Sequence, residues 1–263
     1  MAGIFAGFIC SCTEFNMDTK ESLPVVEAYL YANSQEIELK VSEMIPFSES
    51  GSEQVVVEDA QIVLSNETNT YSLVHDETRP GYYISPTPIE MISGSIFSLQ
   101  MEHGTGVVIG STEIPEMPVG VKLSKHEVKI SPINTLSEFE QLRDLDFAVQ
   151  WDNPDNSFYF VTIDNISESP QSIFDFGSEV NVGFSLITEP TVENMRSFNL
   201  YDINQFGTYR VRVYKVNSEY VDLYNSKQQD SRNLNEPLTN LENANGIFTA
   251  FSYDEVTFKI IKD

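Results

Sequence analysis

The chain has 263 residues, which is enough for one large domain or two ordinary ones. Its 40 acidic and 15 basic residues give a formal net charge of −25, which argues against nucleic-acid binding because that function needs a basic surface. The same charge argues against an electrostatic hold on anionic lipid. No apolar run reaches the roughly 18 residues that a membrane-spanning helix requires, and an acidic surface that resists association is the simplest interpretation of the charge.

The first twelve residues are almost wholly apolar and end in Ile9-Cys10-Ser11-Cys12. A bulky aliphatic residue, two small residues and a cysteine in this order resemble the lipobox of bacterial lipoproteins, in which the last cysteine is acylated. We therefore expect residues 1–12 to form a signal peptide and lipobox, with Cys12 as the lipidated first residue of the mature protein. The polar residues 13–22 are expected to be a tether. The alternative is a frayed apolar terminus or a first strand.

Short strands separated by turns are predicted from Pro24 onward. Alternating apolar and polar residues indicate strands at residues 25–31, 36–41, 57–65, 71–74, 79–84, 95–101 and 107–111. Asn33-Ser34 favours a hairpin between the first two strands, and Gly81 would permit a tight bend. This spacing predicts a sandwich or a barrel. The order of strand and turn residues also resembles the prealbumin-like modules of carboxypeptidase regulatory domains.

A boundary between two modules is predicted at residues 113–118, because Pro115 and Pro118 resist continuous strand pairing. We expect an N-terminal sandwich over residues 23–118 and a C-terminal sandwich over residues 119–263. Further strands are predicted at residues 147–151, 158–163, 180–186, 208–214, 246–251 and 255–260. The strand ending at Trp151, its proline turn and the aromatic strand that follows resemble fibronectin-type or immunoglobulin-like sandwiches.

One segment departs from the strand pattern. Tyr220, Leu223 and Tyr224 are spaced as i, i+3 and i+4, which predicts a short helix near 218–227 that begins after Asn217 or Ser218. We expect its apolar face to cover the second sheet. The predicted fold class is therefore all-β, with a prealbumin- or immunoglobulin-like first module and a fibronectin- or immunoglobulin-like second module that carries the helix.

A family resemblance depends on the last part of the chain. The segment YRVRVY at 209–214 is followed by the helix, by NEPL at 235–238 and by NGIFTAFS at 245–252. With the lipobox and the opening PVVEAYL at 24–30, this order resembles the domain-of-unknown-function 4249 family of Bacteroidota lipoproteins over nearly the whole chain. The resemblance implies an envelope lipoprotein, anchored at the outer membrane by lipid and accessory to a TonB-dependent transporter. It implies no catalytic residue, and it does not name the ligand.

No phosphate loop, dinucleotide fingerprint, zinc spacing or nucleophile elbow occurs in the sequence, so we expect no catalytic site and no cofactor. Both cysteines lie in the leader, which leaves the body of the chain without a disulfide. His75, His103 and His126 lie in separate segments, and structural or exposed roles are expected for them. A carboxylate pair for glycoside hydrolysis cannot be selected from sequence.

One turn gathers hard oxygen ligands, and it is the candidate calcium site. Asp152, Asn153 and Asp155 would be the ligands. The turn lacks the glycine and the terminal glutamate of an EF-hand, and an Asx turn that closes a hairpin is the simpler interpretation. Trp151, the single tryptophan, is more typical of a sandwich core than of an exposed sugar-binding platform.

Together these features predict a non-catalytic outer-membrane lipoprotein that captures a nutrient beside a transporter and binds no nucleic acid. The alternative is a structural or adhesive surface protein that assembles by strand addition at open sheet edges. A hydrolase is the third possibility.

Overall fold

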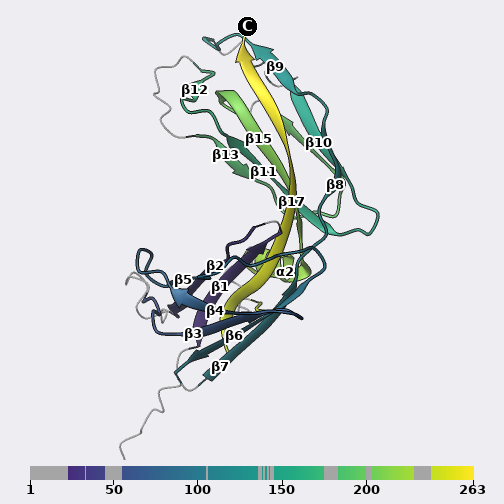
Figure 1. The fold of residues 1–263 in the computed structure, drawn as a ribbon. Helices are drawn as coiled ribbons and strands as arrows, with labels where there is room; N and C mark the ends of the chain where they lie inside the picture. The colour runs from purple at the N-terminus through teal and green to yellow at the C-terminus, as the bar shows by residue number, and fades with distance from the viewer. Residues whose placement is uncertain are drawn as a thin grey trace, which may run out of the picture.

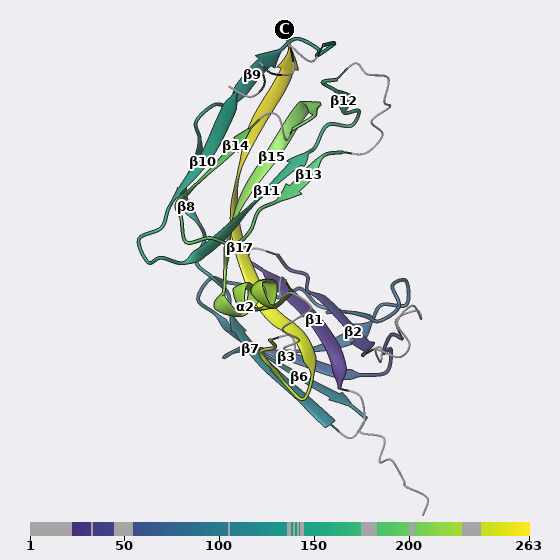
Figure 2. The ribbon, with the colours of Figure 1, turned by 180° about the vertical axis from the view of Figure 1, so that it is seen from behind.

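The computed structural model describes residues 23–32, 34–44, 55–104, 106–135, 138, 140, 142, 145–174, 183–199, 203–227 and 238–263. Within them, two β-sandwich modules lie end to end and share one long strand, β17 (Asn245–Lys262), as Figures 1 and 2 show. This confirms the predicted fold class. The expected signal peptide, Cys12 and tether lie outside the described residues. No helix in the described part of the chain is long and apolar enough to cross a membrane.

The first module packs two sheets against each other. One contains β1 (Pro24–Tyr31), β2 (Glu38–Glu43), β5 (Tyr82–Ile84) and the first half of β17. The other contains β4 (Thr70–His75), β3 (Gln61–Ser65), β6 (Ile96–His103), β7 (Gly106–Glu113) and β16 (Leu241–Glu242). The two sheets meet at β4, which pairs with β3 along its first residues and with β5 at its end.

Strict alternation of side chains builds the first core. Along β1, every second residue is buried, so Val26, Ala28 and Leu30 face the opposite sheet. The predicted hairpin is confirmed, because β1 and β2 pair antiparallel. Gly81 has a φ of 78° and lies against the backbone of β2, where a Cβ would come 2.9 Å from the Val41 carbonyl oxygen. The predicted bend therefore requires glycine.

The second module also packs two sheets. The larger contains β13 (Ser185–Ile187), β11 (Phe158–Asn165), β15 (Gln205–Val216) and the second half of β17, with β9 (Glu127–Ile130) and β12 (Gln171–Ser172) at its margins. The smaller contains β14 (Met195–Asn199), β10 (Asp146–Asp152) and β8 (Val119–Leu123). Phe147 and Phe258 stack between the sheets with ring centroids 4.3 Å apart. Trp151 is 2% exposed, as a core residue should be.

Two sequence predictions about strands are corrected. The strand expected from residue 57 begins at Gln61, because the Tyr83 hydroxyl donates to the Val57 carbonyl and accepts from the Ala60 N–H, which holds residues 57–60 in an arch. The two strands expected at 246–251 and 255–260 are one strand. Ser252, Tyr253 and Asp254 continue the antiparallel register with β15 without a break. The predicted strand at 180–186 lies partly outside the described residues.

The C-terminal limit of the second module is also corrected. Leu241, Ala244, Phe248 and Ala250 belong to the first core, and the first half of β17 pairs parallel with β1. The chain therefore returns to the first module before it completes the second one. The division near residue 118 marks where the second module begins, but residues 119–263 do not form one unit.

The helix α2 (Ser218–Lys227) has the predicted bounds and lies at the junction of the modules (Figure 2). Its Tyr220 ring contacts Phe160 of β11 and Phe251 of β17, with centroids 5.6 and 5.1 Å apart. Its Glu219 carboxylate accepts hydrogen bonds from the hydroxyls of Thr112 and Thr249, at 2.8 and 3.2 Å. The helix therefore covers part of the second sheet, as expected, and also holds the first module.

Candidate functional site

The outer face of the shared sheet carries polar and aromatic side chains at the module junction. In β15, Val211 and Val213 point into the second core, so Arg212 and Tyr214 point to the opposite face. In β17, Phe258 and Ile260 point inward, and Tyr253 lies on the same outer face, opposite Tyr214 in the register. The face continues onto β1, where Tyr31 lies opposite Phe251.

A third hydrophobic cluster fixes this face. Its buried members are Phe160, Tyr214, Val216, Val221 and Phe251, with Tyr29, Tyr31, Phe158, Tyr220 and Tyr253 packed around them. The rings of Phe160 and Tyr214 are stacked 4.7 Å apart, and the Tyr214 and Tyr253 centroids lie 5.1 Å apart. Burial raises the pKa of Tyr29 to about 12, with a further contribution from Glu27. The Tyr29 hydroxyl is therefore a neutral hydrogen-bonding group at physiological pH.

A hollow of about 480 Å³ opens beside this cluster, and we call it the junction hollow. Its lining residues come from both modules: Tyr31, Ala32, Ser34 and Glu38 from the first, and Arg212, Tyr214 and Tyr253 from the second. Because neither module supplies both sets, the site exists only when β17 holds the two modules together.

Arg212 is held in place from several sides. Its Nε donates to the Glu255 carboxylate at 3.1 Å, its Nη1 donates to the Tyr214 hydroxyl at 3.4 Å, and its Cζ lies 4.9 Å from the Tyr253 ring centroid. Burial acts to lower the pKa of the guanidinium, but the hydrogen bond to Glu255 and the tyrosine oxygens outweigh it, so the pKa is raised. A fixed cation therefore stands among aromatic rings.

Two further hollows are lined by residues of the first module. The middle hollow, about 330 Å³, is lined by Ser34, Gln35, Pro88, Ile89, Glu90, Met91 and Ile92. It shares Ser34 with the junction hollow. The Ile89 N–H donates to the Gln35 carbonyl at 3.0 Å, which joins the two segments that form its walls.

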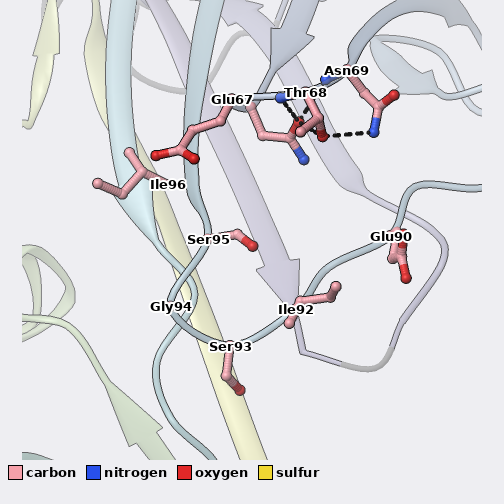
Figure 3. A pocket seen from close by; sticks show the side chains of 10 residues that line it. Glu67, Thr68, Asn69, Glu90, Ile92, Ser93, Gly94, Ser95 and Ile96 are labelled. Carbon is pink, nitrogen blue, oxygen red and sulfur yellow. Dashed lines mark hydrogen bonds between the residues drawn. The ribbon is translucent and has the colours of Figure 1, made fainter.

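The distal hollow, about 370 Å³, shares Glu90 and Ile92 with the middle one. It is lined by Asn66, Glu67, Thr68, Asn69, Glu90, Ile92, Ser93, Gly94, Ser95 and Ile96. Figure 3 shows Glu67 and Glu90 on opposite sides of it. The Asn66 Oδ1 accepts from the N–H groups of Thr68 and Asn69, at 3.1 and 2.8 Å, so this wall is a closed Asx-type turn. We call the three hollows together the groove.

The candidate calcium ligands form a turn between β10 and β11. The Asn153 Oδ1 accepts from the Ser157 N–H at 2.9 Å, and its Nδ2 donates to the Val192 carbonyl at 2.7 Å. Asp155 accepts from Lys215 at 2.9 Å, while Asp152 lies against Gly120. These contacts are those of the Asx-turn alternative. In the described ranges, no group of three or more His, Cys, Asp or Glu residues is arranged to hold a metal ion.

Two of the histidines lie beside the same segment, which the sequence did not indicate. His75 Nε2 is 3.8 Å from Glu58, and His103 Nδ1 is 3.9 Å from Asp59. His126 lies just before β9, where its carbonyl accepts from the Lys259 N–H. These contacts join surface loops to strand ends, which is a structural role.

Local sequence does not mark the residues of the junction hollow. Tyr31 and Glu38 fall in predicted strands, and Arg212 falls in the motif YRVRVY. One signal was available, because alternation in that motif places Arg212 and Tyr214 together on the face opposite to the core. Their pairing with Tyr253 could not be seen, since it depends on the register between β15 and β17.

Comparison with known proteins gives a family and distant structural likenesses. No curated protein matches the chain. A segment of two fibronectin type-III domains from chicken tenascin aligns at 10% identity and a TM-score of 0.27, covering 90% of this chain and 99% of that one. The FN1–FN3 domains of chicken CNTN1 align at 8% identity and a TM-score of 0.27, covering 90% of this chain and 67% of that one. Residues 12–257 match the family described as "Domain of unknown function (DUF4249)", and the chain belongs to that family.

Proposed function

We propose that this protein is a non-catalytic binding lipoprotein of the bacterial cell envelope. In this proposal, lipid on Cys12 holds it at the outer membrane, and it captures a nutrient for a TonB-dependent transporter. The observation that carries the proposal is the junction hollow of about 480 Å³, which both modules line with tyrosines and one arginine. Ligand sites commonly lie at domain interfaces, where apolar walls carry a small number of placed polar groups.

A preformed binding site supports the proposal. Arg212 is fixed by Glu255, Tyr214 and Tyr253, all residues of the chain itself. A side chain that is already ordered loses less conformational freedom on binding, which favours affinity. The position of the site at the end of the first module also leaves both walls anchored in well-packed cores.

The proposed outer-membrane localisation rests on the segment Ile9-Cys10-Ser11-Cys12 and on the apolar residues before this segment. To test it, the full chain and a Cys12→Ser variant would be expressed in a host that processes lipoproteins, and membranes would be fractionated. We expect the unaltered protein in the outer-membrane fraction with acyl chains on Cys12 by mass spectrometry, and the variant in the soluble fraction. Unmodified Cys12 with residues 1–11 still attached would contradict this localisation.

The partner is tested separately. The unaltered protein would be purified under mild detergent from cells that express it natively, and its partners would be identified by mass spectrometry. We expect a TonB-dependent transporter to copurify in proportion to the bait. Repeated purification without any transporter would remove the accessory role, while leaving the ligand site to be tested on its own.

A structural or adhesive role is the second candidate, and one observation favours it. Among the described residues, β13 is the last strand on one side of its sheet, and its Ile187 is 66% exposed. An open edge can accept a strand from another chain. Filaments of purified protein in electron micrographs, lost in an Ile187→Lys variant, would favour this role. A monomer that binds a small ligand would contradict it. With only three residues, β13 is a short template for strand addition, so we prefer the binding role.

A further inference from the structure

We propose that the groove binds a neutral oligosaccharide, with one end of the sugar chain in the junction hollow. The inference rests on the proposed binding function and names the chemical class of its ligand. Three features of the groove carry it: the balance of charge, the nature of the walls, and the extent of the three hollows.

The charges in and around the junction hollow select against anionic ligands. Glu38 lines it, and Glu255 pairs with Arg212 at its edge, in a chain of net charge −25. An anionic ligand would therefore meet a strongly unfavourable field. A cationic ligand would be attracted by the same field, but inside the hollow it would meet the fixed positive charge of Arg212. A neutral ligand meets no such local repulsion.

The same groups suit hydroxyls, which both donate and accept hydrogen bonds. Arg212 can only donate and the Glu38 carboxylate can only accept, while the hydroxyls of Tyr31, Tyr214 and Ser34 can do either. The tyrosine rings add apolar surface to the walls, although Arg212 lies over the Tyr253 ring and Phe160 stacks on the Tyr214 ring. A polyhydroxylated ring therefore finds a partner for each kind of group that it carries.

The distal hollow has a matching chemistry without any cation. Its lining includes the amides of Asn66 and Asn69 and the hydroxyls of Thr68, Ser93 and Ser95, and it contains no Lys, Arg or His. Neutral donors and acceptors predominate, and the two glutamates would repel an anionic chain. Both ends of the groove therefore favour the same class of ligand.

The extent of the groove indicates a chain rather than a single sugar. The junction and middle hollows adjoin at Ser34, and the middle and distal hollows adjoin at Glu90 and Ile92. Each hollow exceeds roughly 300 Å³, the lower limit for pockets that hold a drug-sized ligand. If one linear oligomer spans all three, its affinity rises with its length, which can be measured.

The test uses titration calorimetry on the full chain in detergent. The probes are neutral hexasaccharides of α-glucan, β-glucan, xylan, mannan and N-acetylated chitin type, their monosaccharides, a hexagalacturonate and a fully deacetylated chitosan hexamer. We expect at least one neutral hexasaccharide to bind, at least about a hundredfold more tightly than its monosaccharide and at least about tenfold more tightly than either charged hexamer. Binding of none of the neutral hexamers, or tighter binding of a charged one, would overturn the inference.

Variants then locate the site. Glu38→Gln removes an exposed acceptor of the junction hollow with almost no change in shape, and we expect it to weaken binding of the neutral hexamer about fivefold or more. Glu127→Gln is the matched control on β9 at the far end of the second module, and its affinity should equal that of the unaltered protein. Equal affinity of both variants would place the sugar elsewhere and overturn the inference.

These outcomes are separable from those of the proposed function. Lipid on Cys12 and a copurifying transporter, together with no binding of any neutral hexamer, would retain the function and reject this ligand class. Binding of a neutral hexamer without a copurifying transporter would retain this ligand class and reject the accessory role. Cleavage of the bound hexamer, detected by mass spectrometry after incubation, would contradict the non-catalytic role while supporting the ligand class.

Discussion

The Ser252 hydroxyl donates a 2.7 Å hydrogen bond to the backbone carbonyl of Glu116, and this contact ties the segment between the modules to the middle of β17. The segment is not a loose linker. Ile114 is completely buried, and Met117 packs against the first core. The two buried proline residues therefore lie in a docked connection between the modules.

Replacing Ser252 with alanine should loosen this connection. Ser252 is completely buried, so the variant leaves a carbonyl that has lost its partner, at a cost of about 1 kcal/mol in the free energy of unfolding. Denaturant titration would measure the loss. Ser98→Ala on the exposed face of β6 is the control and should change the free energy of unfolding by less than about 0.5 kcal/mol. Equal stability of both variants would show that the hydrogen bond contributes nothing.

Glycine at position 246 should be required where β17 enters the first sheet. Gly246 has a φ of 99°, and a Cβ there would meet the backbone carbonyl oxygen of Val26 on β1. Gly246→Ala combines backbone strain with that clash, and we expect a loss of about 3 kcal/mol. Gly104→Ala is the control, with a φ of 58° and nothing within 4 Å of its Cβ, and should lose only about 1 kcal/mol. A thermal unfolding series in which the two losses are equal would contradict the close approach.

Destabilising the first core should shift the unfolding transition of the second module, which the fluorescence of Trp151 reports. Phe248 is completely buried in the first core, on the strand that both modules share, and Phe248→Ala should cost about 3–5 kcal/mol. Trp151 is the single tryptophan and lies in the second core. If β17 couples the two modules, the midpoint of the Trp151 fluorescence transition falls with the midpoint measured by circular dichroism. The exposed-site variant Ile109→Ala should move neither, and an unchanged Trp151 midpoint in Phe248→Ala would show that the modules unfold independently.

The ion pair between Asp155 and Lys215 should make the free energy of unfolding depend on pH in the acid range. Hydrogen bonds from Lys215 and Ser157 lower the pKa of Asp155 from 3.8 to about 2. A depressed folded-state pKa stabilises the protein above the ordinary value, and this contribution disappears as the pH falls from about 4 to about 2. The difference in unfolding free energy between the unaltered protein and Asp155→Asn should therefore shrink over that range.

Carboxyl chemical shifts give an independent check on that pair. In the unaltered protein, the Asp155 carboxyl should titrate near 2, and in Lys215→Met its midpoint should rise toward 3.8 because the hydrogen bond from the Lys215 ammonium group is gone. An Asp155 midpoint at the ordinary value in the unaltered protein would contradict the pair. Asp155 is half exposed, so added salt should reduce the effect.

Local pattern was sufficient for much of the first module. Alternation of apolar and polar residues predicted the strands around Val26 and Leu99, and the bend at Gly81 followed from a glycine between two strands. The helix at Ser218–Lys227 followed in the same way from residues three and four positions apart. Strands of two or three residues, such as β12, β16 and β13, were missed or misplaced, because so few residues are too short a stretch to show an alternation of apolar and polar side chains.

The candidate site was harder to predict than the fold. Tyr31 and Tyr253 are 222 positions apart in number, and they line one hollow only because β17 pairs with β1 and then with β15. Nothing in the sequence around either residue marks it as different from the other tyrosines of the chain. The calcium candidate showed the opposite case, in which Asn153 and Asp155 of a suggestive local cluster accept hydrogen bonds from Ser157 within one turn.

The sequence by itself determined the strand content, the helix, the buried Trp151 and the absence of a local catalytic motif, because each depends on residues that are near neighbours in the chain. Only the tertiary structure decided that one strand of 18 residues serves both modules, and that Arg212 therefore faces Tyr31 and Glu38 across their junction. The physical reason is that strand pairing joins residues by register over long distances. The hydrophobic period reveals which face of a strand is buried, but not which strand lies beside it.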